Sequence, residues 1–228
     1  MPTRKLSVMS SPKPYSWLPR VLFPLGRCLI RLQLRKFVGR KPWEPVPLEV
    51  VGPSEIPSGG LLIIGNHRSD IDPPLVQYNF PRGIHFMGQD YLFEMKIWGP
   101  AIRFFHAFPI SRGKVDRAAL RHAVELLKMG EVVCIFPEGG ITTGYGVRPL
   151  EAGVTLILRQ TGATVLCCGL HGTAEFMSGG DLNVRVETGD VKVVWGEPIR
   201  FAKDAEPDVV LDTLRSELIR LSGMPAVE

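Results

Sequence analysis

A histidine and a carboxylate lie five positions apart, at His67 and Asp72, directly after the apolar run Leu61–Ile64. On a continuous helix, five residues rotate the chain by about 500°, so the two side chains would diverge by roughly 140°. They can face each other only if the backbone turns between them. A carboxylate beside an imidazole fixes its tautomer and stabilises its protonated form, which a general base requires. The spacing therefore predicts a paired base and carboxylate on a turn.

The residues around this pair indicate how it is positioned. The apolar run Leu61–Ile64 predicts a short buried strand. Asp72 followed by Pro73 predicts a helix N-cap with proline in the first turn. We therefore expect His67 at the carboxyl end of a strand and Asp72 at the start of a helix, with the loop folding one toward the other. Asp70 is a second carboxylate in this loop, and we rank it below Asp72.

Two further loops follow short apolar stretches, at Arg112–Lys114 and Pro137–Thr143. In α/β folds, functional groups gather where strands end, so these loops and His67 can converge. The guanidinium of Arg112 suits a phosphate group, and Glu138 lies in a glycine-rich turn. A base, an anion-binding arginine and a glutamate brought together predict a transferase site.

Strand-like and helical stretches alternate along the chain after residue 41. The pattern predicts strands at 48–51, 61–64, 84–87, 108–111, 132–136 and 164–170, and a late hairpin of 183–187 with 191–195. Helical periodicity covers 73–78, 115–129, 150–160 and 208–221, and residues 91–105 show helical periodicity that is broken around Gly99-Pro100. This order predicts an α/β fold: a single layered domain over residues 42–228, with a mixed, largely parallel sheet flanked by helices.

The basic residues are concentrated in residues 1–41, which hold ten Lys or Arg and no acid, whereas the other 187 residues hold 17 basic and 23 acidic side chains. Large apolar residues interleave with Arg27, Arg31 and Arg35, which recur every four residues and so share a helical face. This predicts a basic amphipathic N-terminal helical arm in a bilayer interface, with residues 15–41 contacting membrane lipid. The apolar content argues against nucleic acid as the anionic partner. Two alternatives stay open: an ordinary helix packed on the core with its arginine face in solvent, and an organelle transit peptide.

Charged residues interrupt the arm too often for the roughly 20 apolar residues that a membrane span needs. No adequate apolar core of a signal peptide is present either. We therefore expect peripheral attachment at the cytoplasmic face of a membrane. The four cysteines lack metal-ligand spacing, and three lie in apolar strand-like runs: Cys134, Cys167 and Cys168. They predict buried thiols in a reducing compartment and no metal site.

Four short motifs, in this order, resemble those of the glycerolipid acyltransferases of the 1-acylglycerol-3-phosphate O-acyltransferase type. Asn66, His67 and Asp72 match the motif N-H-x-x-x-x-D, with Ser69 in its common place. Residues 109–113, Pro-Ile-Ser-Arg-Gly, are similar to P-V-x-R-G. Residues 136–139, Phe-Pro-Glu-Gly, are similar to the start of F-P-E-G-T-R-S, and the apolar stretch 165–170 corresponds to V-V-P-V. The resemblance spans roughly residues 48–200.

The resemblance implies a reaction and roles for these residues. It implies transfer of a fatty acyl group from acyl-CoA or acyl-carrier protein to the hydroxyl of a lysophospholipid, 1-acylglycerol-3-phosphate giving phosphatidate, with no cofactor. His67 and Asp72 would be catalytic, with Glu138 positioning either the acceptor or its own loop. The residues expected to bind substrate are Arg112, Glu138, Gly139, Asn66 and Ser69.

Two positions depart from the family pattern. Ile141 stands where the third motif has an arginine that helps bind the acceptor's phosphate, and Cys167 stands where the fourth has proline. Arg148 or Arg103 can substitute for the missing arginine. The alternatives are therefore an acyltransferase for another lysolipid or an aminolipid, a thioesterase, or a non-catalytic membrane-binding protein of the same fold.

Overall fold

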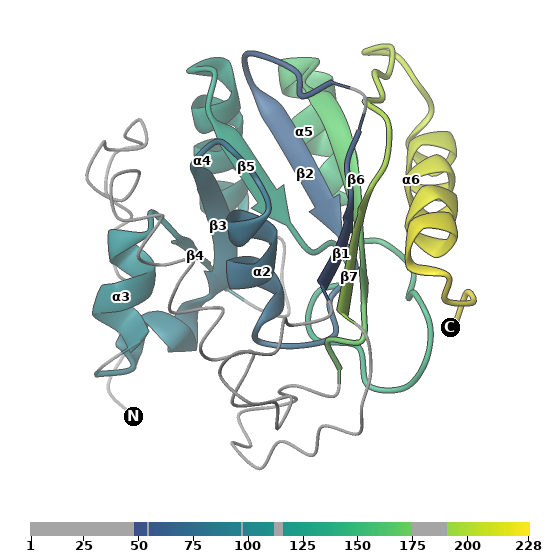
Figure 1. Cartoon of the computed structure of the whole chain (residues 1–228). Helices are drawn as coiled ribbons and strands as arrows, with labels where there is room; N and C mark the ends of the chain where they lie inside the picture. Colours follow the sequence, from purple (N-terminus) through teal and green to yellow (C-terminus); the bar gives the residue numbers. More distant parts are fainter. Residues whose placement is uncertain (1–47, 54, 97, 112–115, 175–190) are drawn as a thin grey trace.

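The computed structural model describes residues 48–53, 55–96, 98–111, 116–174 and 191–228. These residues contain a seven-stranded sheet in the order β1-β7-β6-β2-β5-β3-β4, with helices on both of its faces (Figure 1). The strands are β1 (Leu48–Val51), β2 (Leu61–Gly65), β3 (Ile84–Gln89), β4 (Phe108–Ile110), β5 (Val132–Ile135), β6 (Thr164–His171) and β7 (Val191–Trp195).

Neighbouring strands of the sheet are parallel except β6 and β7, which are antiparallel. The central strand β2 lies between β5 and β6, with Leu61 opposite both Val132 and Thr164. The predicted mixed, largely parallel sheet is therefore confirmed. Residues 183–187 of the predicted hairpin lie outside the described residues, and the antiparallel partner that the structure shows for β7 is β6.

Helices from both halves of the chain cover the sheet. They are α2 (Asp72–Tyr78), α3 (Trp98–Phe104), α4 (Arg117–Lys128), α5 (Gly153–Thr161) and α6 (Pro207–Ser222), with the short 3-10 helix η1 (Asp90–Glu94). Apolar side chains of α4, α5 and α6 pack on one face of the sheet, and those of α2 pack on the other. The sheet is thus the middle of three layers.

Strand β2 is buried on both of its faces. Leu62 and Ile64 pack in the core formed with α4, α5 and α6, whereas Leu61 and Ile63 pack in the core formed with α2. All four side chains are fully buried, and each contributes about 1.5–3 kcal/mol relative to an exposed position. A continuous apolar run is typical of a parallel strand with helices on both sides. The loop that begins at Asn66 therefore starts from a firmly held strand.

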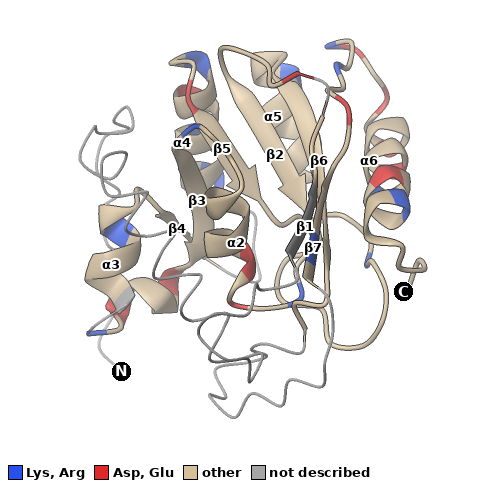
Figure 2. Ribbon diagram, in the orientation of Figure 1, with Lys and Arg blue, Asp and Glu red and all other residues tan. Residues whose placement is uncertain are grey.

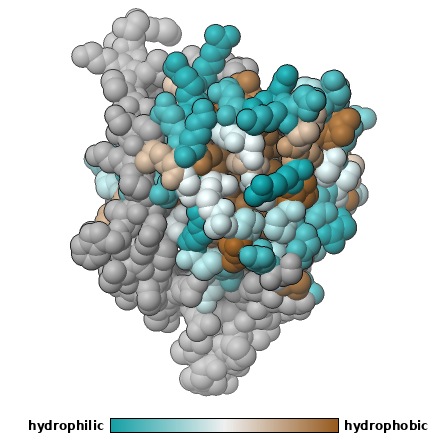
Figure 3. Space-filling view, turned by 90° about the horizontal axis from the view of Figure 1, so that it is seen from above, coloured by the Kyte–Doolittle hydropathy of each residue, from teal (hydrophilic) through white to brown (hydrophobic). Residues whose placement is uncertain are grey.

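Charged residues lie mainly in the helices and loops, and the described strands contain few of them (Figure 2). At the edge where the central parallel strands begin, hydrophilic side chains cover much of the described surface, with hydrophobic ones between them (Figure 3). None of the described helices has the length and apolar character that crossing a membrane requires. The predicted arm, residues 1–41, and its boundary at residue 42 lie outside the described residues.

Candidate active site

The loops that carry the predicted chemistry leave neighbouring strands at the same edge of the sheet. Strands β2 and β5 pair in parallel, with Ile64 opposite Ile135. Residues 66–71 follow β2, and residues 136–152 follow β5. The Thr142 N–H donates to the carbonyl oxygen of His67 at 2.8 Å. The two loops are therefore joined directly, as expected where parallel strands end side by side.

His67 and Asp72 contact each other through their side chains. His67 Nδ1 lies 2.9 Å from Asp72 Oδ2. The same oxygen accepts the backbone N–H groups of Arg68 at 2.7 Å and Ser69 at 2.8 Å. Asp72 is fully buried, so its carboxylate is held in one place by three donors. The predicted turn and the contact across it are confirmed, and their use in catalysis stays a prediction.

The prediction that Asp72 is a helix N-cap is wrong. Helix α2 begins at Asp72 itself, its N-cap is Ile71, and no side chain caps it. The Asp72 carboxylate instead turns back over the preceding loop, where it accepts the backbone N–H groups of Arg68 and Ser69. The predicted proline in the first turn of the helix is present. Asp72 therefore stabilises the loop before the helix and does not cap the helix.

The imidazole of His67 is held against an aromatic ring. Its ring stacks on Phe136, with centroids 4.3 Å apart and planes inclined by 20°. Since Asp72 Oδ2 can only accept, Nδ1 carries the proton of the neutral ring, and Nε2 carries the lone pair. Within the described residues no group is bonded to Nε2, and the side chain is 16% exposed. None of the described groups thus prevents Nε2 from accepting a proton.

Glu138 joins the two loops from inside the protein. Its Oε1 accepts the backbone N–H of His67 at 2.8 Å. Its Oε2 accepts the hydroxyl of Thr142 in a short hydrogen bond and the backbone N–H of Arg148 at 3.0 Å. The residue is buried, with 5% of its surface exposed. Of the two predicted roles, these contacts favour positioning of the loop over contact with the acceptor.

Thr142 and Arg148 complete this network, which the sequence alone did not predict. Arg148 Nε donates to Thr142 Oγ1 at 3.0 Å, and its Nη2 donates to the carbonyl oxygen of Gly140 at 2.9 Å. From its type and its place in a glycine-rich loop, Thr142 resembles an ordinary turn residue. Its spacing of four from Glu138 was the available signal, but a threonine near a glutamate is too common to be diagnostic.

The other predicted binding residues have mixed placements. Asn66 is fully buried, and its amide bonds the backbone of Leu170 on β6, donating at 3.0 Å and accepting at 2.7 Å. Ser69 is also buried, and its backbone N–H donates to Asp72, the partner of His67. Gly139 is exposed and has a φ of 74°, a left-handed conformation that favours glycine. Arg112 lies outside the described residues, so its predicted contact with an anion stays a prediction.

The remaining candidates are structural. The three strand cysteines are buried and free, and burial raises the pKa of Cys167 to about 12. Among the described residues no group of His, Cys, Asp and Glu could hold a metal ion.

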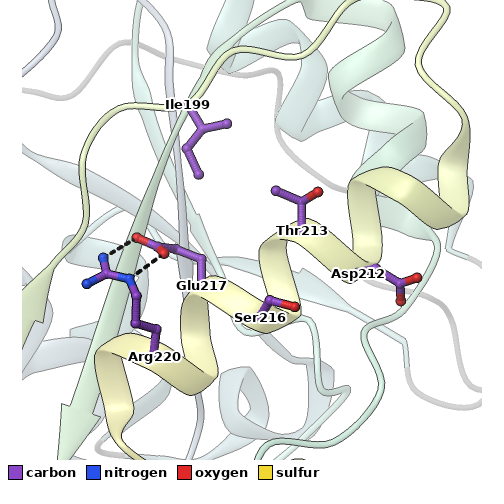
Figure 4. Close-up of a pocket in the computed structure, with 6 residues that line it drawn as sticks. All are labelled: Ile199, Asp212, Thr213, Ser216, Glu217 and Arg220. Carbon is purple, nitrogen blue, oxygen red and sulfur yellow. Dashed lines mark hydrogen bonds and ion pairs between the residues drawn. The ribbon is translucent and has the colours of Figure 1, made fainter.

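A hollow of about 500 Å³ lies away from this network, on α6 beside Ile199 (Figure 4). Its rim holds the ion pair of Glu217 and Arg220 but neither His67 nor Asp72.

The sequence that forms this site is similar to a known protein family. The sequence model of the family described as Acyltransferase matches residues 47–171, more than half of the chain. The chain belongs to the acyltransferase family. The matched segment contains β2, the dyad and the loop of Glu138, so the family assignment covers the geometry described above.

Several individual proteins are similar to this acyltransferase. A 1-acyl-sn-glycerol-3-phosphate acyltransferase of Bacillus subtilis is 32% identical over 122 residues, 54% of this chain and 57% of its own. The chloroplastic enzyme BAT2 of Brassica napus, of the same name, is 26% identical over 75% of this chain and 49% of its own. The chain thus spans about half the length of the curated relatives that it matches.

A solved structure supports the fold over a longer stretch. The crystal structure of PlsC from Thermotoga maritima, a 1-acyl-sn-glycerophosphate acyltransferase, superposes with a TM-score of 0.63 at 26% identity. The match covers 86% of this chain and 80% of that one. The α/β layered fold predicted from the sequence is therefore also the fold of a known acyltransferase.

Proposed function

We propose that this acyltransferase moves a fatty acyl group from a thioester to the free hydroxyl of 1-acylglycerol-3-phosphate, giving phosphatidate. The observation that carries the proposal is the contact of His67 Nδ1 with the buried Asp72 carboxylate, which leaves Nε2 open. The names of the similar proteins, which act on this acceptor, support the choice of substrate.

The proposed reaction needs one proton shuttle. Nε2 of His67 takes the proton from the acceptor hydroxyl as its oxygen attacks the thioester carbonyl carbon. The Asp72 carboxylate stabilises the imidazolium that forms, as in a serine-protease triad with the substrate alcohol in place of serine. The tetrahedral intermediate then collapses, the C–S bond breaks, and Nε2 returns the proton to the thiolate. No covalent intermediate on the enzyme is required.

The loop after β5 offers a donor for the developing oxyanion. The Gly139 N–H already donates to the carbonyl oxygen of Phe136 at 3.3 Å. The next amide, that of Gly140, has no acceptor among the described residues. We assign it the role of stabilising the oxyanion, because backbone N–H groups fixed in advance are well suited to it.

The acyl donor stays open between acyl-CoA and acyl-carrier protein. Both present the same thioester, and the proposed chemistry uses neither a cofactor nor a metal ion. A thioester with a free thiol product allows the reaction to be followed by thiol release with either donor.

Ile141 stands where the family pattern has a phosphate-binding arginine, and the contacts of Arg103 and Arg148 differ in how well they suit that role. Arg103 on α3 donates to the Phe93 carbonyl oxygen at 2.7 Å and lies over the Phe93 ring, 5.3 Å from its centroid. Arg148 instead lies in the loop of Glu138, and among the described residues its guanidinium donates to two neutral oxygens, those of Thr142 and Gly140. We therefore propose Arg148, together with Arg112, as the binder of the acceptor's phosphate.

An acceptor panel tests the proposed function. The purified protein is given a long-chain acyl thioester with lysophosphatidate, other lysophospholipids or a lyso-aminolipid, and lipid products are identified by mass. Transfer to lysophosphatidate supports the proposal, and transfer only to another acceptor replaces it with the alternative that Ile141 favours. Fatty acid release without any acceptor would identify a thioesterase. Absence of both activities would leave the non-catalytic membrane-binding protein.

Arg148→Ala tests the headgroup site. It should raise the KM for lysophosphatidate about 10-fold or more, since a charged hydrogen bond contributes about 1.5–3 kcal/mol. Arg159→Ala, which removes an exposed arginine from α5, is the matched control. An unchanged KM in the Arg148 variant would remove this residue from the site.

We also propose that residues 15–41 bind the lipid surface at the cytoplasmic face of a membrane. The support is the charge pattern of the arm, ten basic residues and no acid within residues 1–41. Deleting residues 1–41 should weaken co-sedimentation with anionic vesicles, most clearly at low salt, where surface charges are least screened. Equal binding by the intact and shortened proteins would refute the proposal.

A further inference from the structure

The C-terminal end of the chain pairs with the loop that carries Glu138. The Val147 N–H donates to the carbonyl oxygen of Pro225 at 2.9 Å, and the Val227 N–H donates to the carbonyl oxygen of Val147 at 3.1 Å. These bonds form a parallel bridge between Val147 and Ala226. We call residues 224–228 the C-terminal tail. The bridge joins this tail to a loop that lies almost 80 residues earlier in the sequence.

Arg215 on α6 fastens both sides of this bridge. Its Nη2 donates to the carbonyl oxygen of Val147 at 3.0 Å and, in a short hydrogen bond, to that of Val227. One partly buried guanidinium thus holds the loop and the tail at the same point. Two carbonyl acceptors at one charged donor form a specific contact, stronger than a bond between neutral groups.

Packing excludes a loose association of loop and tail. Val147 is fully buried, and Met224 is nearly so. A Cβ added to Gly146 would lie 2.2 Å from Val227 Cγ1 and 3.0 Å from the Pro225 carbonyl oxygen. The backbone of the loop therefore lies directly against the tail, and only glycine fits there without displacing it.

The next residue of the loop leads to the catalytic base. Arg148, which follows Val147, donates its backbone N–H to Glu138 Oε2 at 3.0 Å. The other oxygen of that carboxylate accepts the backbone N–H of His67 at 2.8 Å. The position of Val147 thus fixes the amide that helps hold Glu138, and Glu138 helps hold the backbone of His67.

We propose that Arg215 and the C-terminal tail are positioning elements for the general base, acting through Val147, Arg148 and Glu138. This proposal rests on the proposed function, because it assigns the purpose of the contact to catalysis. Neither element touches the substrate. Their effect is to keep the imidazole of His67 aligned, and misplacement of a reacting group by about 1 Å can cost as much as 100-fold in rate.

We call the contacts of Arg215 and the C-terminal tail with Val147 the clamp. Two variants remove it, and a third serves as a control. Arg215→Ala removes the shared donor, and a chain ending at Gly223 removes the tail. Arg220→Ala is matched to the first, because Arg220 is an exposed arginine of the same helix that, in the part of the chain the structure describes, bonds Glu217 alone (Figure 4). Arg215→Lys keeps one cationic donor and should restore part of the lost rate.

The rate is measured per folded molecule, at a temperature well below each variant's unfolding midpoint. The proposal predicts that kcat falls about 10-fold or more in the Arg215→Ala and shortened proteins, with the KM for the thioester changed less than about twofold. Amide hydrogen exchange in residues 137–149 should become faster in both. Arg220→Ala should keep both properties of the original protein.

Other outcomes would overturn the proposal. An unchanged kcat in Arg215→Ala and in the shortened chain, or an equal loss in Arg220→Ala, would show that the clamp does not position the base. If the shortened chain does not fold, Arg215→Ala decides alone. If the original protein transfers to no acceptor, the proposed function has failed. Hydrogen exchange then still decides whether the clamp orders the loop, and unchanged exchange would overturn that part too.

Discussion

Replacing Asp72 by asparagine separates the charge of this carboxylate from its hydrogen bonds. Asp72 Oδ2 accepts from His67 Nδ1 and from the backbone N–H groups of Arg68 and Ser69. The amide oxygen of asparagine can accept the same three donors. The proton of the neutral imidazole therefore stays on Nδ1. The negative charge is lost, and the amide NH2 takes the place of Oδ1, a buried atom that has no hydrogen-bond partner among the described residues.

The structure sets the size of the expected effect. In the proposed reaction His67 becomes an imidazolium, and its bond to Asp72 at 2.9 Å becomes one between two charges. A hydrogen bond to a charged group contributes about 1.5–3 kcal/mol, and about 1.4 kcal/mol corresponds to a tenfold change in rate. Asp72→Asn should therefore lower kcat about 10- to 150-fold and leave the KM of the thioester largely unchanged.

Asp72→Ala is the companion variant. It removes the acceptor that Asp72 Oδ2 offers to the buried N–H groups of Arg68 and Ser69, at a cost of about 1–3 kcal/mol for each bond lost. This variant should lose stability as well as activity. Acceptor-dependent thiol release gives kcat for both variants, and urea unfolding gives their stability.

The comparison exposes an error in either direction. A kcat for Asp72→Asn within about twofold of the original protein would refute the reasoning, because the charge would then have no part in the rate-limiting step. A loss of stability in Asp72→Asn as large as that in Asp72→Ala would show that the amide does not replace the carboxylate in the turn.

Three further predictions concern stability and reactivity. Gly60→Ala should lower the free energy of unfolding by about 1–3 kcal/mol in urea titrations, because its Cβ would lie 2.1 Å from the Leu127 carbonyl oxygen. Gly52→Ala is the control and should leave the free energy of unfolding unchanged, because nothing lies within 4 Å of the added Cβ. The buried cysteines of β5 and β6 should resist alkylation at pH 8, checked by peptide mass spectrometry, because burial holds the pKa of Cys167 at about 12 and thiolates are the reactive form; labelling in the native state would contradict this. Burial, with His106 nearby, lowers the pKa of His85 to about 4 from its ordinary 6.5, so the unfolded chain binds this proton first as pH falls. The free energy of unfolding should therefore drop between about pH 6.5 and 4, and His85→Gln should flatten that slope in urea titrations at several pH values.

The sheet was the most predictable part of the fold. Each strand of the described part begins at the residue that its apolar run predicts, from Leu48 in β1 to Val191 in β7. Apolar residues in short runs between glycines, prolines and charged residues leave few other structures open. The pairing of β7 was less accessible, because strand partners depend on the path of the whole chain.

Helix boundaries were less predictable, and the start of α2 shows why. The pair Asp72-Pro73 has the composition of an N-cap and first turn, yet the carboxylate bonds the loop instead of the helix. A side chain with donors on both sides takes those that the tertiary structure leaves unpaired. The sequence alone does not show which donors those are.

The candidate site was predictable in its reacting groups but not in its support. His67 and Asp72 carry an imidazole and a carboxylate, whose chemistry is known from the residue type. Their spacing predicted the turn that the structure shows. Apart from the bonds that Thr142 Oγ1 makes with Glu138 and Arg148, the contacts of Thr142, Arg148 and Arg215 use backbone amides and carbonyls as partners. Every residue carries such groups, so no residue type marks these contacts in advance.

The most direct test of the account is a single-turnover measurement of thioester consumption by the original protein and by His67→Gln. Glutamine is polar and of similar size but cannot take up a proton. The account predicts that lysophosphatidate triggers thiol release in the original protein, one thiol for each phosphatidate formed. It predicts a loss of at least about 1,000-fold in a His67→Gln protein that is still folded. Acceptor-dependent release at a similar rate in both proteins would contradict the central role of the imidazole.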